Sequence, residues 1–473
     1  MNRATRASAF ATRFDRDDCA IGVVHIGFGA FHRAHQAVYL DDYMEATGDL
    51  RWGIAAVNLR GADTAHFDTA KADIAANDGY YLQSFSADGH VALRRVRSHV
   101  HFADWSVDAA AAEAEIARAS VHFVTMTVTE SGYYTDPTGR LAEDDPVIAA
   151  EIAGGAPSSV YGYLRAGLRA RIAAGGAPIT IACCDNIRSN GKMLGRNLSD
   201  YLRACGDTQT AEWIAQNAVF PCSMVDRITP RSPDGLGDEI AAIVGRPVAS
   251  PVMAEDFMQW VLQDSAAAAM PELSRADVIV TADVDPYEET KIRVLNGGHT
   301  ALAYLAALEG IETFDAAMRV PHLADHFDAF EMQDVLPALT LDLPFSKSDY
   351  VADIRRRFGN RAIGDTVARI CADGMAKFPI FIRPTLEGCF AQGRVPRATI
   401  HSIAGWFVFA RHVAAGKIPF KYVEPGWDDL AAMLTGDAFV TSTQLWGDVP
   451  TRFPEFADLL RHEISELESK WPV

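Results

Sequence analysis

The chain has 473 residues, 49% of them hydrophobic and 22% charged, a globular composition large enough for two or three domains. Its formal charge of -19 makes the surface acidic, which repels a phosphate backbone and excludes nucleic acid as an expected partner. The seven cysteines have neither a paired spacing nor a zinc-ligand pattern, so we expect reduced thiols and no metal.

The first 18 residues contain arginines and serines but no apolar segment of the signal-peptide type. A secretory signal is therefore not expected. A transit peptide stays the alternative, although acidic residues begin at Asp15. Elsewhere no apolar run reaches the roughly 18 residues that span a bilayer. We expect a cytoplasmic protein with no membrane partner.

Up to about residue 280, apolar strands alternate with helical patterns. A hairpin is predicted around Ala87–Gly89. Strands that alternate with helices favour a parallel sheet covered on both faces. The predicted strands are 21–29, 51–59, 121–129 and 178–186, and the predicted helices are 32–46 and 64–77.

Beyond about residue 285, helical periodicity replaces the strand pattern. Pro286 suits the first turn of a helix, where its missing N–H has no cost. We therefore predict an α/β fold, with a Rossmann-type parallel-sheet domain at 1–285 and a mostly α-helical domain at 286–473. The predicted helices of the second domain are 288–308, 362–374, 397–415 and 428–434.

A glycine turn ends the first of these strands and opens a helix, as in a dinucleotide-binding motif. Gly27 and Gly29 supply two glycines of G-x-G-x-x-G, and His32 stands at the third position. Such a turn brings backbone amides close to a pyrophosphate at a helix N-terminus. A glycine turn that binds nothing is the alternative. Residues expected to contact the cofactor here are Gly27, Phe28, Gly29, Ala30, Phe31 and Arg33.

The residues at the end of the second strand are expected to determine whether the protein prefers NAD or NADP. An acid there binds the ribose 2′-hydroxyl, whereas a base accepts a 2′-phosphate. Asp63 favours NAD, and Arg60 leaves NADP open. Asn58 beside them, and Val128 and Thr129 at the end of the third strand, complete the expected cofactor contacts.

Two common dehydrogenase designs do not fit. Tyr287 and Lys291 match Y-x-x-x-K of short-chain dehydrogenases, but those chains are much shorter and carry the pair nearer the glycine turn. Zinc-dependent medium-chain enzymes need a cysteine–histidine set that the sequence lacks.

Six segments together resemble the polyol-specific long-chain dehydrogenases, and the similarity runs from about Gly22 to at least Gly416. The resemblance implies a zinc-independent enzyme with an N-terminal nucleotide domain and a helical C-terminal domain. The segments are VVHIGFGAFHRAHQAVYLDD, TVTESGYY, CCDNIRSNG, SMVDRITPR, DVDPYEETKIRVLNGGHTALAYLA and RICADGMAKFP.

The resemblance also implies the catalytic residues. Lys291, Asn296 and His299 match the family motif K-x-x-x-x-N-x-x-H, whose lysine is the general base. On an α-helix the three span about 140° of arc. A lysine takes a hydroxyl proton at neutral pH only if burial or nearby positive charge favours its neutral form, and we expect this of Lys291. Asn186 and Asn296 match amide donors that stabilise the developing alkoxide.

The remaining matches concern the substrate and the proton route. Asp226, Arg369 and Lys377 match substrate-binding residues, and His299 matches a residue that hydrogen-bonds near the reacting oxygen. Glu288 resembles a glutamate that passes the proton to solvent, while its neighbour Glu289 is expected to be exposed.

The resulting hypothesis is an NAD-dependent polyol dehydrogenase that interconverts a sugar alcohol and its 2-ketose, such as D-mannitol and D-fructose or D-arabinitol and D-xylulose. NADP is not excluded, and a monomer or weak homodimer is expected. One alternative is a uronate reductase of the same family, which an additional cation in the pocket would favour. Another is a nucleotide-binding sensor without catalysis, against which the intact lysine and asparagines argue.

Overall fold

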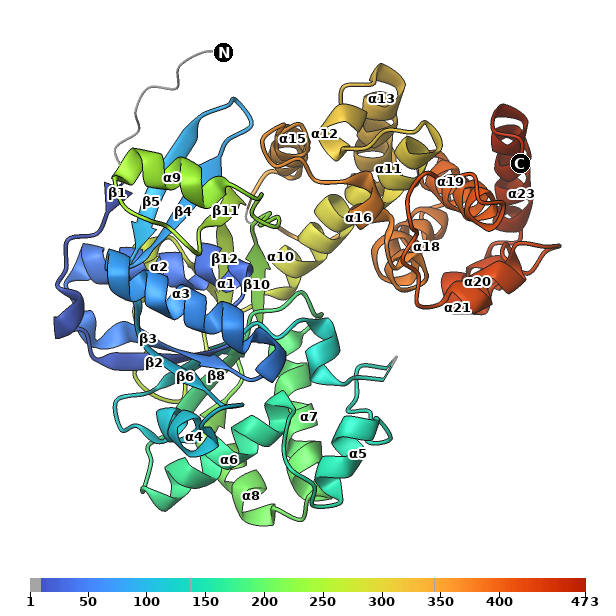
Figure 1. Ribbon diagram of the computed structural model, residues 1–473. Helices are drawn as coiled ribbons and strands as arrows, with labels where there is room; N and C mark the ends of the chain where they lie inside the picture. The colour runs from blue at the N-terminus through green and yellow to red at the C-terminus, as the bar shows by residue number, and fades with distance from the viewer. Residues whose placement is uncertain (1–9, 137, 344) are drawn as a thin grey trace. The chain divides into compact units, whose positions relative to one another are not determined.

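The computed structural model describes residues 10–136, 138–343 and 345–473, which fall into two compact units (Figure 1). We call the first the sheet unit; it comprises the residues up to Phe85 and Val91–Asp285. The second, the helical unit, comprises Ser86–His90 and Pro286–Val473. No helix in the described ranges is long and apolar enough to cross a membrane.

A six-stranded sheet of parallel strands organises the sheet unit and confirms the predicted fold class. Its order is β6-β3-β2-β7-β8-β9, in which the chain starts at the centre and builds one half of the sheet before the other. This is the order of dinucleotide-binding folds, which bind their ligand where the winding direction reverses. The strands are β2 (Ile21–Ile26), β3 (Gly53–Asn58), β6 (His99–Asp104), β7 (Phe123–Met126), β8 (Ile179–Cys183) and β9 (Ala218–Val219).

Helices cover both faces of this sheet, because successive side chains along each strand point to opposite sides. Val23 of β2 packs in one core with α2 and α3, whereas Val24 packs in another with α4, α6 and α7. The ribbon shows α2 and α3 on one side of the sheet and α4, α6 and α7 on the other (Figure 1). The helices of this unit are α1 (Ala30–Ala34), α2 (Gln36–Thr47), α3 (Thr64–Asn77), α4 (Ala109–Ala117), α5 (Pro146–Ile152), α6 (Val160–Ala173), α7 (Asn190–Ala204), α8 (Thr208–Asn217) and α9 (Leu236–Val244).

Two smaller sheets complete the unit. The predicted hairpin is present, since β4 (Tyr80–Phe85) and β5 (Val91–Val96) pair antiparallel. They lie between β1 (Phe10–Ala11) and β11 (Val252–Glu255) in a four-stranded sheet. The three-stranded sheet, which the sequence did not predict, consists of β10 (Ser223–Asp226), β12 (Gln259–Gln263) and β13 (Ile279–Thr281).

A single hydrophobic core holds the helical unit together around α11 (Gly297–Leu308). The further α-helices are α10 (Asp285–Thr290), α12 (Phe314–Ala317), α13 (Pro321–Ala329), α14 (Leu336–Ala338), α15 (Lys347–Phe358), α16 (Val367–Cys371), α17 (Gly374–Lys377), α18 (Arg383–Ala391), α19 (Arg397–Ala414), α20 (Trp427–Met433), α21 (Thr443–Trp446), α22 (Val449–Arg452) and α23 (Glu455–Lys470).

Two predicted helices of this unit are interrupted. The helix predicted at 288–308 changes into a π-helix over Lys291–Asn296 between α10 and α11. The helix predicted at 362–374 is split into α16 and α17, because Asp373 adopts a left-handed backbone conformation (φ 60°). Two more π-helical segments, Phe330–Val335 and Phe378–Ile382, occur in the same unit.

Candidate active site

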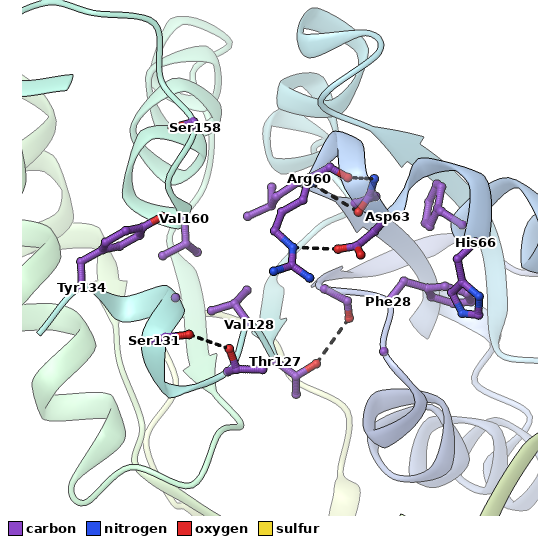
Figure 2. A pocket seen from close by; sticks show the side chains of 17 residues that line it. Phe28, Arg60, Asp63, His66, Thr127, Val128, Ser131, Tyr134, Ser158 and Val160 are labelled. Carbon is purple, nitrogen blue, oxygen red and sulfur yellow. Dashed lines mark hydrogen bonds and ion pairs between the residues drawn. The ribbon is translucent and has the colours of Figure 1, made fainter. Parts of the chain in front are cut away.

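A cavity of about 520 Å³ opens in the sheet unit where β2, β3 and β7 end (Figure 2). The carboxyl ends of parallel strands at this point of the sheet are the usual place for a dinucleotide. The lining residues are Gly27, Phe28, Gly29, Asn58, Leu59, Arg60, Asp63, His66, Phe67, Thr127, Val128, Thr129, Ser131, Gly132, Tyr134, Ser158 and Val160.

The glycine turn has the geometry that a close backbone approach requires. Gly27 has φ +94°, and a Cβ atom there would lie 2.2 Å from the carbonyl oxygen of Thr127, so no other residue fits. Gly29 is exposed at the start of α1, and a Cβ atom there would meet nothing within 4 Å. The turn therefore leaves open space at a helix N-terminus, as a phosphate requires.

Polar side chains form the wall of the cavity at the end of β3. Asn58 Nδ2 donates to Asp104 Oδ2 at 2.8 Å. Arg60 Nε donates to Asp63 Oδ2 at 2.7 Å, and both side chains line the cavity (Figure 2). The acid and the base that the sequence places here thus form one exposed ion pair.

Asp185 holds the loop after β7 in place, a role that the sequence did not reveal. Its carboxylate accepts from the amide of Val128 at 2.8 Å, the amide of Thr129 at 3.3 Å and the hydroxyl of Tyr133 at 2.7 Å. Burial raises the pKa of Asp185 to about 6, and the hydrogen bonds from Tyr133 and Val128 oppose that rise. At neutral pH the carboxylate therefore fixes a loop that forms one wall of the cavity.

Replacing Asp185 with alanine is expected to weaken NADH binding by about tenfold or more, because hydrogen bonds to a carboxylate contribute about 1.5–3 kcal/mol each. Fluorescence titration with NADH checks this. Asp200, half-buried on α7, gives a control: Asp200→Ala is expected to leave the affinity unchanged. Equal affinities of the Asp185→Ala and Asp200→Ala proteins would contradict the role of Asp185.

Eight of the eleven predicted cofactor residues line the cavity, and Ala30, Phe31 and Arg33 do not. Arg33 is buried, and its Nη1 donates to both oxygens of Ser250 at 2.9 Å. The cavity also has walls that the sequence did not indicate. They include Thr127 beside the glycine turn and His66, Tyr134, Ser158 and Val160.

Two predicted site residues belong to the sheet unit, the catalytic amide Asn186 and the substrate-binding residue Asp226. Asn186 is exposed and follows β8 at the same edge of the sheet as the glycine turn. Asp226 is the last residue of β10 and is only 4% exposed. Cys183, the last residue of β8, and Cys184, which follows it, are fully buried, and all seven cysteines are unpaired.

In the helical unit, Lys291 is the first residue of the π-helical segment and is only 6% exposed. Asn296, half-buried, is its last residue. A π-helix bonds residues five apart, so Lys291 and Asn296 lie about one turn from each other. In a regular α-helix they would be about 140° apart. The wider turn therefore brings the backbone positions of Lys291 and Asn296 onto one face.

His299 lies in α11 just beyond that segment and is the one half-buried residue between Gly297 and Ala307. Its ring stacks on Phe358, with centroids 3.9 Å apart, and meets the edge of Phe314 at 4.6 Å. Burial lowers the pKa of His299 well below its usual value, and the charges of Arg369, Arg357 and Lys377 lower it further. His299 is therefore a neutral imidazole, which can donate one hydrogen bond and accept another.

The predicted residues Arg369 and Lys377 thus act electrostatically on His299, together with Arg357, which the sequence did not single out. Arg369 Nε donates to Asp365 at 2.6 Å, and Lys377 Nζ donates to the carbonyl of Ile370 at 2.9 Å. Burial lowers the pKa of Lys377. This part of the helical unit is accordingly rich in hydrogen-bond donors.

The two glutamates of α10 are both half-buried. The proton-transfer role of Glu288 stays a prediction. The expectation that Glu289 is exposed is wrong, because its carboxylate accepts from Nη1 of buried Arg293 at 3.2 Å. In the described ranges no group of three or more histidine, cysteine or acidic side chains could hold a metal ion.

Comparisons with known proteins cover nearly the whole chain. Residues 21–275 match the mannitol dehydrogenase Rossmann domain and 283–455 the mannitol dehydrogenase C-terminal domain. The chain is 37% identical to a D-arabinitol 4-dehydrogenase of Ralstonia nicotianae, over 91% of this chain and 93% of that protein. It is 35% identical to a mannitol 2-dehydrogenase of Cereibacter sphaeroides, over 97% and 95%. Its fold matches the Pseudomonas fluorescens mannitol 2-dehydrogenase in ternary complex with NAD and D-mannitol, with a TM-score of 0.84, 30% identity and coverage of 99% and 95%.

Proposed function

The chain belongs to the mannitol dehydrogenase family, and we propose that it is an NAD-dependent polyol dehydrogenase that interconverts a sugar alcohol and its 2-ketose. The single observation that most supports this is Lys291, a lysine only 6% exposed on a π-helical turn with Asn296. Buried lysines are uncommon, and their desolvation favours the neutral amine that a general base requires.

The cavity of the sheet unit fits a dinucleotide. Gly27 and Gly29 leave room for a pyrophosphate beside the start of α1, and Asp63 offers a carboxylate for a ribose hydroxyl. Bound NAD would supply the acceptor for the hydride that leaves the alcohol carbon. The same residues admit NADP only if Arg60 turns from Asp63 toward a 2′-phosphate.

Lys291 accepts the hydroxyl proton during oxidation and returns it during reduction. Asn296 donates to the oxygen on which negative charge develops, without itself titrating. The neutral imidazole of His299 hydrogen-bonds near the same oxygen, and Glu288 passes the proton onward. Asn186 acts as a second amide donor. Asp226 accepts from substrate hydroxyls, to which Arg369 and Lys377 donate.

A substrate panel tests the proposal. We expect NAD reduction with mannitol, arabinitol or sorbitol and NADH oxidation with the matching ketoses, measured by absorbance. Xylitol and NADP extend the panel. Activity on fructuronate or tagaturonate alone would overturn the polyol class, and cofactor binding without turnover of any compound would favour a sensor.

Asp63→Ala is expected to shift cofactor preference toward NADP, raising the ratio of kcat/KM for NADP to that for NAD about tenfold or more. The substitution removes the acceptor for the ribose hydroxyl and releases Arg60 from the 2.7 Å ion pair. Steady-state kinetics with both cofactors give the ratio. Arg60→Ala is the matched variant and is expected to move the ratio in the opposite direction. A ratio unchanged in both variants would contradict the proposal that Asp63 and Arg60 determine the preference between NAD and NADP.

A uronate reductase is the second candidate, and one observation favours it. Arg357, Arg369 and Lys377 all act electrostatically on His299, so a substrate carboxylate would meet positive charge there. Asp365 offsets the charge of Arg369 through their ion pair. The uronates of the substrate panel decide between the two candidates.

A further inference from the structure

His32 occupies the position of the third glycine in G-x-G-x-x-G, and the proposed function leaves it without a role. The third glycine normally lets the helix pack closely on the first strand. Here the ring of His32 lies flat on the ring of His25 of β2, with centroids 3.2 Å apart and planes inclined by only 9°. At this position two stacked rings therefore lie between α1 and β2, where the motif otherwise has a glycine.

His25 connects this stack to the glycine turn. Its ring nitrogens lie 2.7 Å from the hydroxyl of Thr125 and 3.0 Å from that of Thr127. The Thr127 hydroxyl also donates to the carbonyl of Gly27 at 3.4 Å, and both residues line the cavity (Figure 2). The position of the His25 ring therefore affects the place where a pyrophosphate would bind.

A third histidine connects the stack to another wall of the cavity. Nε2 of His32 lies 2.9 Å from Nε2 of His99, the first residue of β6. The ring of His99 meets that of Phe28 edge to face, with centroids 5.1 Å apart, and Phe28 lines the cavity. None of the three histidines is more than 1% exposed. Burial lowers the pKa of each, so all three are neutral.

We propose that His32 is a positioning residue for the cofactor: stacked on His25 and bonded to His99, it fixes the glycine turn and Phe28 in the shape that binds the dinucleotide. The inference rests on the proposed function. We expect His32 to affect the affinity for the cofactor and not the proton transfer at Lys291. The role has two parts: the planar ring, which stacks on His25 at a separation of 3.2 Å, and the ring nitrogen, which bonds His99.

Substitutions that keep or remove the planar ring test this inference. His32→Phe keeps a flat ring, His32→Leu keeps an apolar side chain of branched shape, and His32→Gly restores the glycine motif without the stack. We expect the Kd for NADH to rise about tenfold or more in the leucine and glycine variants, and by less in the phenylalanine variant, which keeps the stack on His25 but loses the bond to His99. The KM for NAD should rise in parallel, while kcat at saturating NAD stays within about threefold of wild type.

The control is His101→Leu, on the same strand as His99 but 43% exposed and paired with Glu115. It is expected to bind NADH like wild type. Circular dichroism identifies which variants fold, and the comparison of leucine with phenylalanine suffices if the glycine variant does not. Equal NADH affinity of the leucine, phenylalanine and wild-type proteins overturns the role of His32. Failure of wild type to bind NADH or NADPH overturns the proposed function instead.

Discussion

Replacing Lys291 with alanine is expected to lower kcat by roughly 10²–10⁴-fold, the usual contribution of a general acid or base. The Kd for NADH should stay within about threefold of wild type, because the dinucleotide cavity consists of residues of the sheet unit alone. Single-turnover kinetics and fluorescence titration measure the two quantities separately. A large loss of turnover with intact cofactor binding is the signature of a missing proton acceptor.

A buried lysine also contributes packing, so a second variant is needed. Lys291→Met keeps most of the side-chain volume and removes the amine, and we expect it to be as inactive as the alanine variant. Lys192→Ala removes a lysine whose side chain is 65% exposed and should retain full activity. Turnover above half of the wild-type value in the methionine variant would show that Lys291 is not the base.

The π-helical turn at Lys291 connects this prediction to the packing of the helical unit. Gly298, which follows the turn, lets a second segment approach closely, whereas a Cβ atom on Gly297 would make only an ordinary contact with a third. A Cβ atom on Gly298 would lie 2.7 Å from Oε1 of Glu331, and one on Gly297 would lie 3.4 Å from the carbonyl oxygen of Phe381. Both neighbours belong to π-helical segments themselves. π-Helical segments are rare and often lie at functional sites, so the three among the described residues of this unit agree with the proposed role of Lys291.

Much of the fold could be predicted because its signals are local. Apolar runs bounded by turn residues identified β2, β3, β7 and β8, and α3 begins and ends where the pattern does, at Thr64 and Asn77. The short strands of the three-stranded sheet were missed, because strands such as Ile279–Thr281 are too brief to show a period. The break at His35 between α1 and α2 was also missed, since no glycine or proline marks it.

Candidate site residues could be predicted only where they belong to a recognisable sequence motif. The resemblance located Lys291, Asn296 and His299, but helical periodicity could not reveal the π turn, since its residues are as apolar as those of an α-helix. Contacts between residues distant in sequence were equally invisible. The carboxylate of Asp185 bonds a loop more than fifty positions away, and His32 meets His99 across 67 positions. Such partners depend on the folded topology and not on the local pattern.

The second large effect that we predict is a dependence of the unfolding free energy on pH, caused by Glu331. It is fully buried in the π-helical segment Phe330–Val335, and neither carboxyl oxygen has a hydrogen-bond partner among the described residues. Burial raises the pKa of Glu331 well above its usual value, although the positive charge of Arg293 opposes the rise. The folded protein therefore retains a proton that the unfolded chain releases above about pH 4.3. From that pH up to the raised pKa, this group makes folding less favourable, by on the order of 1 kcal/mol per pH unit.

Glu331→Gln keeps the size and neutrality of the protonated side chain and removes the titration. We expect its unfolding free energy, relative to wild type, to increase between pH 5 and pH 8 by on the order of 1 kcal/mol per unit until the raised pKa is passed. Urea titrations across that range measure the difference. Asp325→Asn, at an exposed position of α13, is the control for the removal of an acidic side chain. A glutamine variant that loses stability relative to wild type as the pH rises would mean that Glu331 is ionised and held by Arg293. In that case the carboxylate beside Gly298 would stabilise the segment that carries Lys291 through its charge.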